Sequence, residues 1–123
     1  MTWHLTIPVL PLSMNERERT HWAIRSRELA QLTSAIHYLA LEQRIPPATG
    51  RRSVLVTIHK SLRSRVTDDP ANRDSRAKSI LDAMVATGLL VDDDDAHLEW
   101  LGVVEGERMA AKQTVVTISE GGS

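Results

Sequence analysis

Apolar and polar residues alternate along four short segments of the chain, and this period of two predicts four β-strands. The segments are residues 2–9, 53–60, 98–104 and 113–119. Pro8 either ends the first strand or confines it to a sheet edge, because proline has no amide hydrogen to donate to a neighbouring strand. The stretch between the last two segments, residues 105–110, predicts a hairpin loop.

Two further segments repeat apolar residues at intervals of three and four, which predicts helices with one buried face. The first covers residues 18–44 and stops before a Pro-Pro pair. Its apolar positions include Trp22, Leu29, Leu32 and Ile36. The second covers residues 71–87 and ends at Gly88, a residue suited to a left-handed helix cap.

The order of these segments is β-α-β-α-β-β, which predicts an α/β (α+β) fold with one mixed β-sheet of about four strands packed with two helices. The length accommodates a single domain over residues 1–123, with a frayed tail at residues 119–123. No stretch approaches the roughly 18 uninterrupted apolar residues of a membrane span, so we expect a cytoplasmic protein with no membrane partner. The absence of cysteine excludes disulfides, thiol chemistry and cysteine-ligated metal sites.

The net charge of −1 conceals a division of charge along the chain. Residues 1–78 hold 13 Lys and Arg against 7 Asp and Glu, whereas residues 79–123 hold 2 against 9. This asymmetry favours one region that faces a polyanion and one that faces cations, although two solvated surfaces would give the same counts. Basic residues cluster between positions 51 and 78, and such a cluster attracts phosphate backbones. Its members are Arg51, Arg52, Lys60, Arg63, Arg65, Arg73, Arg76 and Lys78.

Most aspartates fall at Asp69, Asp74 and the run Asp92–Asp95. Mg²⁺ prefers carboxylate and water oxygens, so these residues form a metal site if folding brings the two segments together. An acidic run can equally be a solvated loop, and Asp69 can be a helix N-cap before the proline that follows it. A calcium-binding EF-hand loop beginning at Asp92 is excluded, because His97 and Val103 stand where that loop needs glycine and glutamate.

Asp74, Lys78 and Asp82 follow one another at intervals of four, which places them on one stripe of the second helix. As a surface ladder they would contribute only about 0.2–0.5 kcal/mol per pair. In the alternative reading, Asp74 binds a metal ion and Lys78 stabilises negative charge on a phosphate. A basic rim around an acidic centre suits a metal-dependent enzyme that cleaves phosphodiester bonds, since the rim holds the backbone and the acids hold the cation.

Other chemistries have less support in the sequence. The five histidines form no His-Glu-x-x-His pair for zinc. The chain has neither a glycine-rich phosphate loop nor a Gly-x-Ser-x-Gly elbow, so we expect no nucleotide cofactor and no serine hydrolase. Three Trp, one Tyr and no Phe predict that any nucleic-acid binding depends little on base stacking.

The chain contains, in this order, Asp69-Pro70-Ala71-Asn72, Asp74, Lys78, Leu81-Asp82-Ala83-Met84, Gly88 and Asp92-Asp93. Nearer the amino terminus it contains Pro11-x-Ser13-x-Asn15, followed by His21-Trp22. This combination, which spans nearly the whole chain, resembles the RusA-type Holliday-junction resolvases, a family common in phages and prophages. The resemblance implies a homodimeric crossover junction endodeoxyribonuclease that resolves four-way DNA junctions by paired phosphodiester hydrolysis. The implied metal is Mg²⁺, with Mn²⁺ as an alternative ion.

The resemblance also implies roles for individual residues. Asp74 and Asp93 match metal-binding aspartates, and Lys78 matches the catalytic lysine. The first acidic position is open, because Asp69 fits the Asp-x-x-Asn pattern whereas an ungapped count back from Lys78 gives Asn72. We favour Asp69 and take Asp92 as a further metal ligand. The expected DNA contacts are Arg63, Arg65, Arg73, Arg76 and Asn15.

Two other classes of protein remain open. One is a non-catalytic protein of phage or prophage type that binds branched or duplex DNA, in which the aspartates cap helices and shape a dimer surface. The other is a small protein-interaction domain without DNA affinity, whose binding would lack the steep salt dependence of phosphate contacts.

Overall fold

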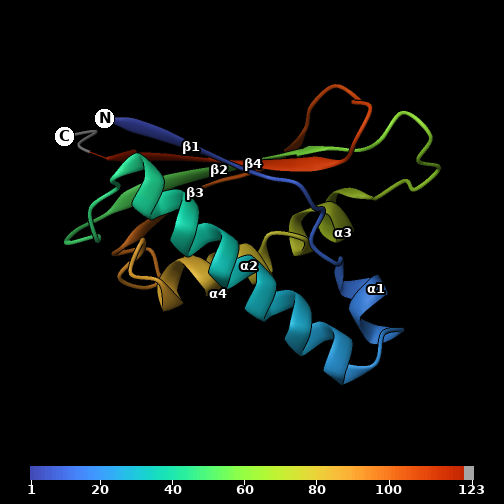
Figure 1. The fold of residues 1–123 in the computed structure, drawn as a ribbon, viewed down its shortest axis with the longest axis horizontal. Coiled ribbons are helices and arrows are strands. Elements are labelled where there is room, and N and C mark those ends of the chain that lie inside the picture. Colours follow the sequence, from blue (N-terminus) through green and yellow to red (C-terminus); the bar gives the residue numbers. More distant parts are fainter. Residues whose placement is uncertain (121–123) are drawn as a thin grey trace.

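The helices of this protein all lie on one face of a single sheet in the computed structural model, which describes residues 1–120 (Figure 1). The strands are β1 (Thr2–Ile7), β2 (Arg52–His59), β3 (Leu98–Glu105) and β4 (Gln113–Glu120). The helices are α1 (Met14–Glu18), α2 (Trp22–Gln43), α3 (Pro70–Ser75) and α4 (Lys78–Ala86). The predicted α+β domain with one mixed sheet of four strands is confirmed. Among the described helices, none combines the length and the apolar character needed to cross a membrane.

The strands lie in the order β1-β4-β2-β3, with β2 and β3 parallel and the other two pairs antiparallel. The predicted hairpin between β3 and β4 is therefore wrong, because β2 lies between these strands. β4 suits the centre of the sheet, since every second residue from Thr114 to Ile118 is fully buried. β3 carries the exposed residues Glu99 and Leu101, which suit an edge. β1 forms the other edge and ends just before Pro8, as predicted.

The predicted helix over residues 71–87 is divided into α3 and α4, whereas the predicted helix over residues 18–44 begins later than expected, at Trp22, and a short helix α1 precedes it. Residues 19–21 separate α1 from α2. There the Thr20 hydroxyl donates to the Glu16 carbonyl, and the His21 ring accepts an amide hydrogen from two residues ahead. Such side-chain bonds offer the backbone an alternative to a continuous helix. The second break, between α3 and α4, falls at Arg76, whose side chain is buried.

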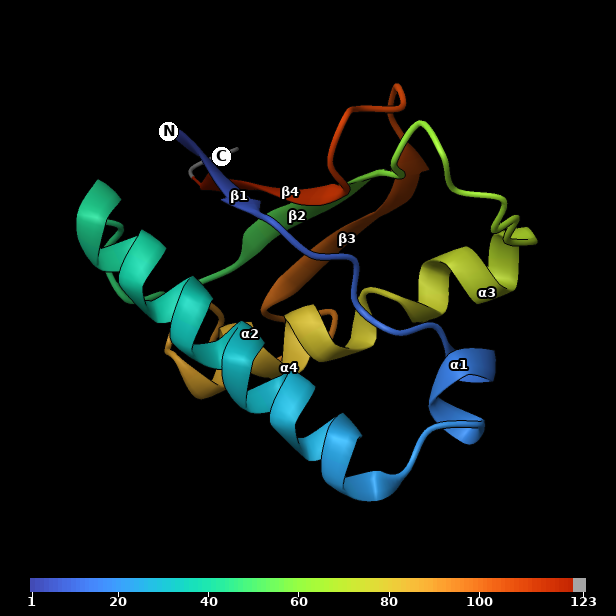
Figure 2. The same cartoon turned by 45° about the vertical axis from the view of Figure 1, so that its right-hand side comes forward.

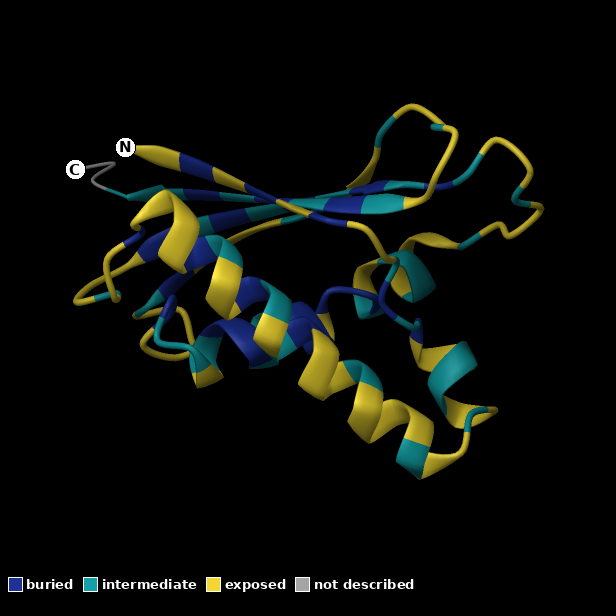
Figure 3. Ribbon diagram, viewed as in Figure 1, coloured by how far each residue is buried: buried dark blue, intermediate teal, exposed yellow. Residues whose placement is uncertain are grey.

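The core lies between the sheet and the helices α2 and α4 (Figure 3). The sheet contributes Trp3, Leu5, Ile7, Val54, Val56, Ile58, Val116 and Ile118, and the helices contribute Leu32, Ile36, Ala40, Ile80, Ala83 and Met84. The amino-terminal part of α2 extends beyond this core, so Trp22 and Leu29 are exposed although their spacing placed them on the buried face.

Polar side chains cover the sheet face that carries no helix. The hydroxyls of Thr2 and Ser119 lie 3.3 Å apart, and the His4 ring lies 3.1 Å from the Thr117 hydroxyl. Ser119 and Glu120 therefore belong to β4 and not to the frayed tail that we expected. The rest of that tail, residues 121–123, lies outside the described residues.

A glycine cap ends α4 and directs the chain into the acidic run. Gly88 has a φ of 81°, the left-handed conformation that we predicted. The Leu89 amide donates to the Met84 carbonyl at 2.9 Å, and the Gly88 amide donates to the Val85 carbonyl at 3.2 Å. This pair of bonds is the Schellman motif. No other atom lies within 4 Å of the position that a Cβ would take, so the requirement for glycine comes from the backbone alone.

Replacement of this glycine tests the cap. We expect Gly88→Ala to lower the free energy of unfolding by about 1–2 kcal/mol, because a Cβ disfavours the left-handed conformation. Gly50→Ala is the matched control, since Gly50 also has no neighbour within 4 Å but lacks a positive φ. The control should leave stability unchanged or raise it by up to about 1 kcal/mol. Denaturant unfolding measures both variants, and equal losses would contradict the prediction.

Candidate active site

A small hollow beside α3 and α4 collects several of the charged side chains that the sequence singled out. We call it the carboxylate pocket, and it has a volume of about 170 Å³. Its lining residues are Asp74, Ala77, Lys78, Leu81, Asp82, Asp93 and Trp100. α3 supplies Asp74, α4 supplies Lys78 and Asp82, and the loop after α4 supplies Asp93. The fold thus brings together Asp74 and Asp93, which are distant in the sequence.

The predicted stripe of Asp74, Lys78 and Asp82 survives the break between the two helices. Arg76 and Ala77 keep right-handed helical dihedral angles, and the Ala77 amide donates to the Asp74 carbonyl at 3.1 Å. The chain therefore follows a helical path through the break, and residues four positions apart stay on one side of it.

Trp100 reaches the pocket from the edge strand β3, and no motif in the sequence had pointed to it. Leu98 faces the core, so Trp100 lies on the same face of the sheet two residues later. The pairing with β2 then shifts by one residue, and Gly102 adopts a φ of 96° at the shift. This bulge allows Val103 to face the core in turn.

The charges in the carboxylate pocket are only weakly paired with one another. Lys78 Nζ lies 3.8 Å from Asp82 Oδ2, and both side chains are largely exposed. Such a pair contributes less than about 1 kcal/mol, so Lys78 is free to turn toward another anion.

The oxygen donors of the pocket suit a hard divalent cation. Over residues 1–120, no three His, Asp or Glu side chains are grouped closely enough to hold a metal ion. Asp74, Asp82 and Asp93 therefore surround one pocket without forming a ready-made ligand set. Mg²⁺ commonly binds through one or two carboxylates and completes its shell with water and phosphate oxygens. The residues present fit that pattern of coordination.

Two of the predicted metal ligands lie outside the pocket. Asp69 Oδ1 accepts the Asn72 amide hydrogen at 2.7 Å, so Asp69 is the N-cap of α3 with Pro70 in the first turn. Asp92 Oδ1 accepts the amide hydrogen of Asp93 at 2.8 Å. Neither Asp69 nor Asp92 lines the carboxylate pocket, and one oxygen of each carboxylate is engaged by a local backbone amide, so their roles as metal ligands stay predictions.

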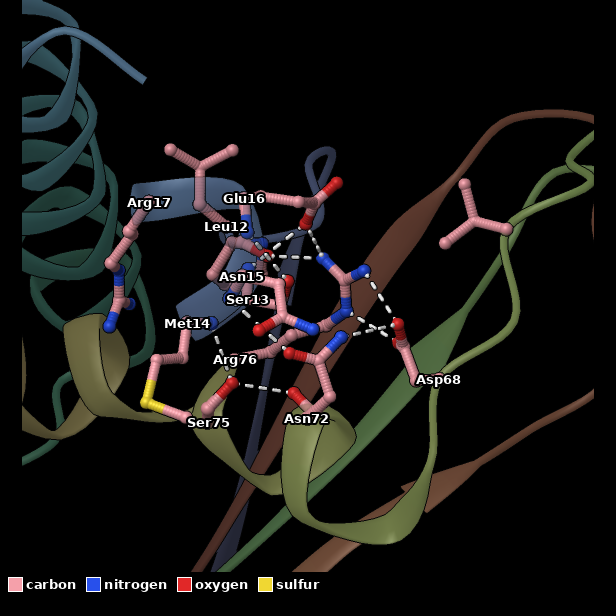
Figure 4. A network of polar contacts seen from close by, with 12 residues as sticks. Leu12, Ser13, Met14, Asn15, Glu16, Arg17, Asp68, Asn72, Ser75 and Arg76 are labelled. Atoms are coloured by element: carbon pink, nitrogen blue, oxygen red, sulfur yellow. Dashed lines mark hydrogen bonds and ion pairs between the residues drawn. The ribbon is translucent and has the colours of Figure 1, made fainter. Parts of the chain in front are cut away.

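A buried ion network surrounds Arg76, which stands between Asp74 and Lys78 in the sequence (Figure 4). Arg76 Nε donates to Asp68 Oδ2 at 2.7 Å, and Nη1 donates to Glu16 Oε1 at 2.6 Å and to the Pro11 carbonyl at 2.8 Å. The side chains of Arg76 and Asp68 are only 4% and 1% exposed. The network therefore joins α1 and the segment before α3 to the break between α3 and α4.

Burial removes three members of the predicted basic cluster from the surface. Lys60 Nζ lies 3.6 Å from Asp68 Oδ2 and 3.1 Å from Glu105 Oε1. The buried Arg52 guanidinium donates to the Glu120 carboxylate and to two backbone carbonyls. Lys60, Arg52 and Arg76 are bonded to protein groups, so the expected DNA contact of Arg76 is corrected: its charge serves the fold.

The motif near the amino terminus belongs to the same network. Ser13 and Glu16 form a capping box at the start of α1, in which each side chain accepts the other residue's amide hydrogen. The Asn15 amide donates to Asn72 Oδ1 at 3.4 Å, and the Asn72 side-chain amide donates to Asp68 Oδ1 at 3.1 Å. Asn72 is therefore engaged in joining α1 to α3 and does not line the carboxylate pocket. Asn15 itself stays exposed.

Three other residues that we expected to contact DNA lie at the surface and differ in how far they are exposed. Arg63 and Arg65 are exposed in the segment between β2 and α3, and Arg73 is half-buried on α3. Figures 1 and 2 place the segment that carries Arg63 and Arg65 at the opposite end of the domain from the acidic loop. These two arginines are accessible to a phosphate, but they do not border the carboxylate pocket.

The network shifts the pKa values of its members. The hydrogen bond from Arg76 lowers the pKa of Asp68, and the charges of Arg76 and Lys60 add to this effect against the opposing effect of burial. Burial alone would raise the pKa of Glu16, but the Ser13 amide and the Arg76 charge outweigh it and lower that pKa. Burial likewise opposes the positive charge of Arg76, yet bonding to Asp68 and the charge of Glu16 raise its pKa.

Comparison with known proteins assigns this chain to no family. No protein-family model matches the chain, and no curated protein matches it.

Removal of the Asp68 charge tests the network. We expect Asp68→Asn to lower the free energy of unfolding by roughly 1–3 kcal/mol, because the buried Arg76 and Lys60 lose their shared counter-ion and keep only Glu16 and Glu105 as partners. Asp69→Asn is the matched control, since asparagine is as good an N-cap as aspartate, and it should change stability by less than about 0.5 kcal/mol. Denaturant unfolding compares the two variants, and a small loss in both would show that the network contributes little.

The lowered pKa values of Asp68 and Glu16 predict a loss of stability in acid. A carboxyl group whose pKa is lower when folded stabilises the fold fully above its unfolded pKa of about 4, and the contribution disappears as pH falls through the folded value. We expect the free energy of unfolding to decline as pH falls below about 4–5, and to decline less in Asp68→Asn. Unfolding series over this range measure the slopes, and parallel slopes would refute the assignment.

Proposed function

We propose that this chain is a cytoplasmic, Mg²⁺-dependent endonuclease that hydrolyses phosphodiester bonds in branched DNA, as its resemblance to the RusA-type resolvases implies. The observation that carries the proposal is the position of Asp74, Lys78 and Asp93, which come from separate segments and line one pocket. Paired acids beside a cationic side chain suit hydrolysis of a phosphodiester, because the acids hold a metal and the cation stabilises the charge that develops on phosphate.

In this proposal, Asp74 and Asp93 hold the Mg²⁺ ion, and Asp82 replaces Asp69 as the third carboxylate. Asp82 is supported because it lines the pocket, whereas Asp69 caps α3. Bound Mg²⁺ supplies a polarised phosphate and an activated water. Lys78 lines the same pocket and is only weakly paired with Asp82. Its ammonium group stabilises the phosphate oxygens or the leaving oxygen.

A homodimer on a four-way junction is part of the proposal, although a single chain carries the whole carboxylate pocket. Resolution of such a junction requires cuts in two strands. A two-fold symmetric dimer presents two identical pockets, one for each strand.

A second candidate is a non-catalytic protein that binds branched or duplex DNA. It is favoured by the finding that, within residues 1–120, no three acidic or histidine side chains are grouped as metal ligands. In that case Asp74 and Asp93 would only shape the surface around bound DNA.

A nicking assay separates the two candidates. We expect the wild-type chain to nick a synthetic four-way junction in the presence of Mg²⁺ or Mn²⁺. Cleavage should stop when EDTA removes the ion. Asp74→Asn should lower the cleavage rate roughly 100-fold or more, the loss that follows when several kcal/mol of charge stabilisation disappear.

Asp95→Asn is the matched control for this assay. Asp95 is exposed in the same loop as Asp93 but does not line the carboxylate pocket, so the variant should cleave as the wild type does. Full cleavage by Asp74→Asn would exclude the ligand role of Asp74. Junction binding by the wild type without cleavage in either metal would favour the non-catalytic candidate.

A further inference from the structure

A second hollow adjoins the carboxylate pocket and shares two of its residues. We call it the aromatic groove, and it has a volume of about 300 Å³. Lys78 and Asp82 line both hollows. From the other side, Arg17, Trp22, Arg25 and Leu29 line the aromatic groove. The groove therefore extends from the proposed site of hydrolysis to the start of α2.

Trp22 presents a large aromatic surface in this groove. It is the first residue of α2, and 64% of its surface is exposed. The His21 ring lies 5.6 Å away at a tilt of 33°, so it does not stack flat on the indole. The amino-terminal part of α2 projects beyond the core at this point (Figure 3), so packing of the domain does not account for a tryptophan there.

Arg17 is fixed at the edge of the groove by buried polar groups. Its guanidinium donates to the hydroxyl of Ser79, which is buried and donates in turn to Glu28 Oε1 at 3.2 Å. The other oxygen of Glu28 accepts the Leu12 amide hydrogen at 3.0 Å. With Arg25 and Lys78, Arg17 gives the groove three cationic side chains against the single carboxylate of Asp82.

We infer that the aromatic groove binds a base whose face is uncovered at a branch point, next to the scissile phosphate, with Trp22 stacked on the base and Arg17 and Arg25 holding the adjacent phosphates. The inference rests on the proposed function for the identity of the ligand as DNA. Aromatic rings stack on any base whose face is free, and cationic side chains hold backbone phosphates without a sequence code. Although the composition predicted little stacking, one ring beside the site is sufficient for one base.

Such a groove explains how the enzyme selects branched DNA. Within a linear duplex both faces of each base are covered by neighbouring base pairs, whereas a branch point offers bases whose faces are free. Trp22 therefore adds affinity at branch points that it cannot add along a linear duplex, and it acts as a specificity-determining residue.

Equilibrium binding in EDTA tests the inference without hydrolysis. The probes are a labelled four-way junction and a linear duplex of the same arm sequence, measured by fluorescence anisotropy. We expect Trp22→Ala to weaken junction binding by roughly 5- to 150-fold, the range that corresponds to loss of one stacked base, and to leave duplex binding unchanged. Trp22→Phe should restore most of the junction affinity, because phenylalanine also stacks.

Tyr38→Ala is the matched control, because Tyr38 is 69% exposed on the same helix and lies outside the groove. Equal junction binding by the wild type and Trp22→Ala would overturn the inference, whatever the nicking assay shows for Asp74→Asn. The inference would also be overturned if the wild-type chain bound the junction no more tightly than the duplex. A Trp22→Ala variant that changed only self-association would overturn it as well. Loss of junction preference in Trp22→Ala, combined with a wild type that does not cleave, would support the groove and refute hydrolysis.

Discussion

The burial of Arg76 between Asp68 and Glu16 is the interaction on which the rest of this structure depends. A helical path turns by about 200° over two residues, so side chains two positions apart point in opposite directions. Because Arg76 points into the protein, Asp74 and Lys78 on either side of it point outward into the carboxylate pocket. The buried network and the candidate site are therefore two consequences of one helical path.

Burial also divides the basic residues of the chain into a buried group that stabilises the fold and an exposed group that can bind a ligand. Arg52, Lys60 and Arg76 hold together segments that are distant in the sequence, because a buried charge is stable only with partners nearby. The exposed arginines of the surface, which include Arg25 and Arg63, remain available to a polyanion. Counts of charge along the sequence cannot separate these groups, since each buried residue finds its partner in another segment.

The candidate site was predictable where local geometry sets it. Asp74 and Lys78 follow from their spacing on a helix, and the resemblance supplied Asp93. Asp69 caps α3 and does not line the pocket, and the sequence could not show this because a capping aspartate and a metal-binding aspartate look alike in it. Trp100 was missed because it lines the pocket only when β3 lies beside α3 and α4 in the folded domain, a contact between segments that the sequence does not reveal.

By itself, the sequence determined the number and period of the strands, the end of the first strand at Pro8 and the glycine cap at Gly88, because each depends on backbone preferences within a few residues. Only the tertiary structure decided the strand order, the break within the predicted helix over residues 71–87 and the direction of Arg76. The strand order depends on pairing between strands that are distant in the sequence. The direction of Arg76 depends on Asp68 and Glu16, which come from other segments and which local backbone preferences do not reveal.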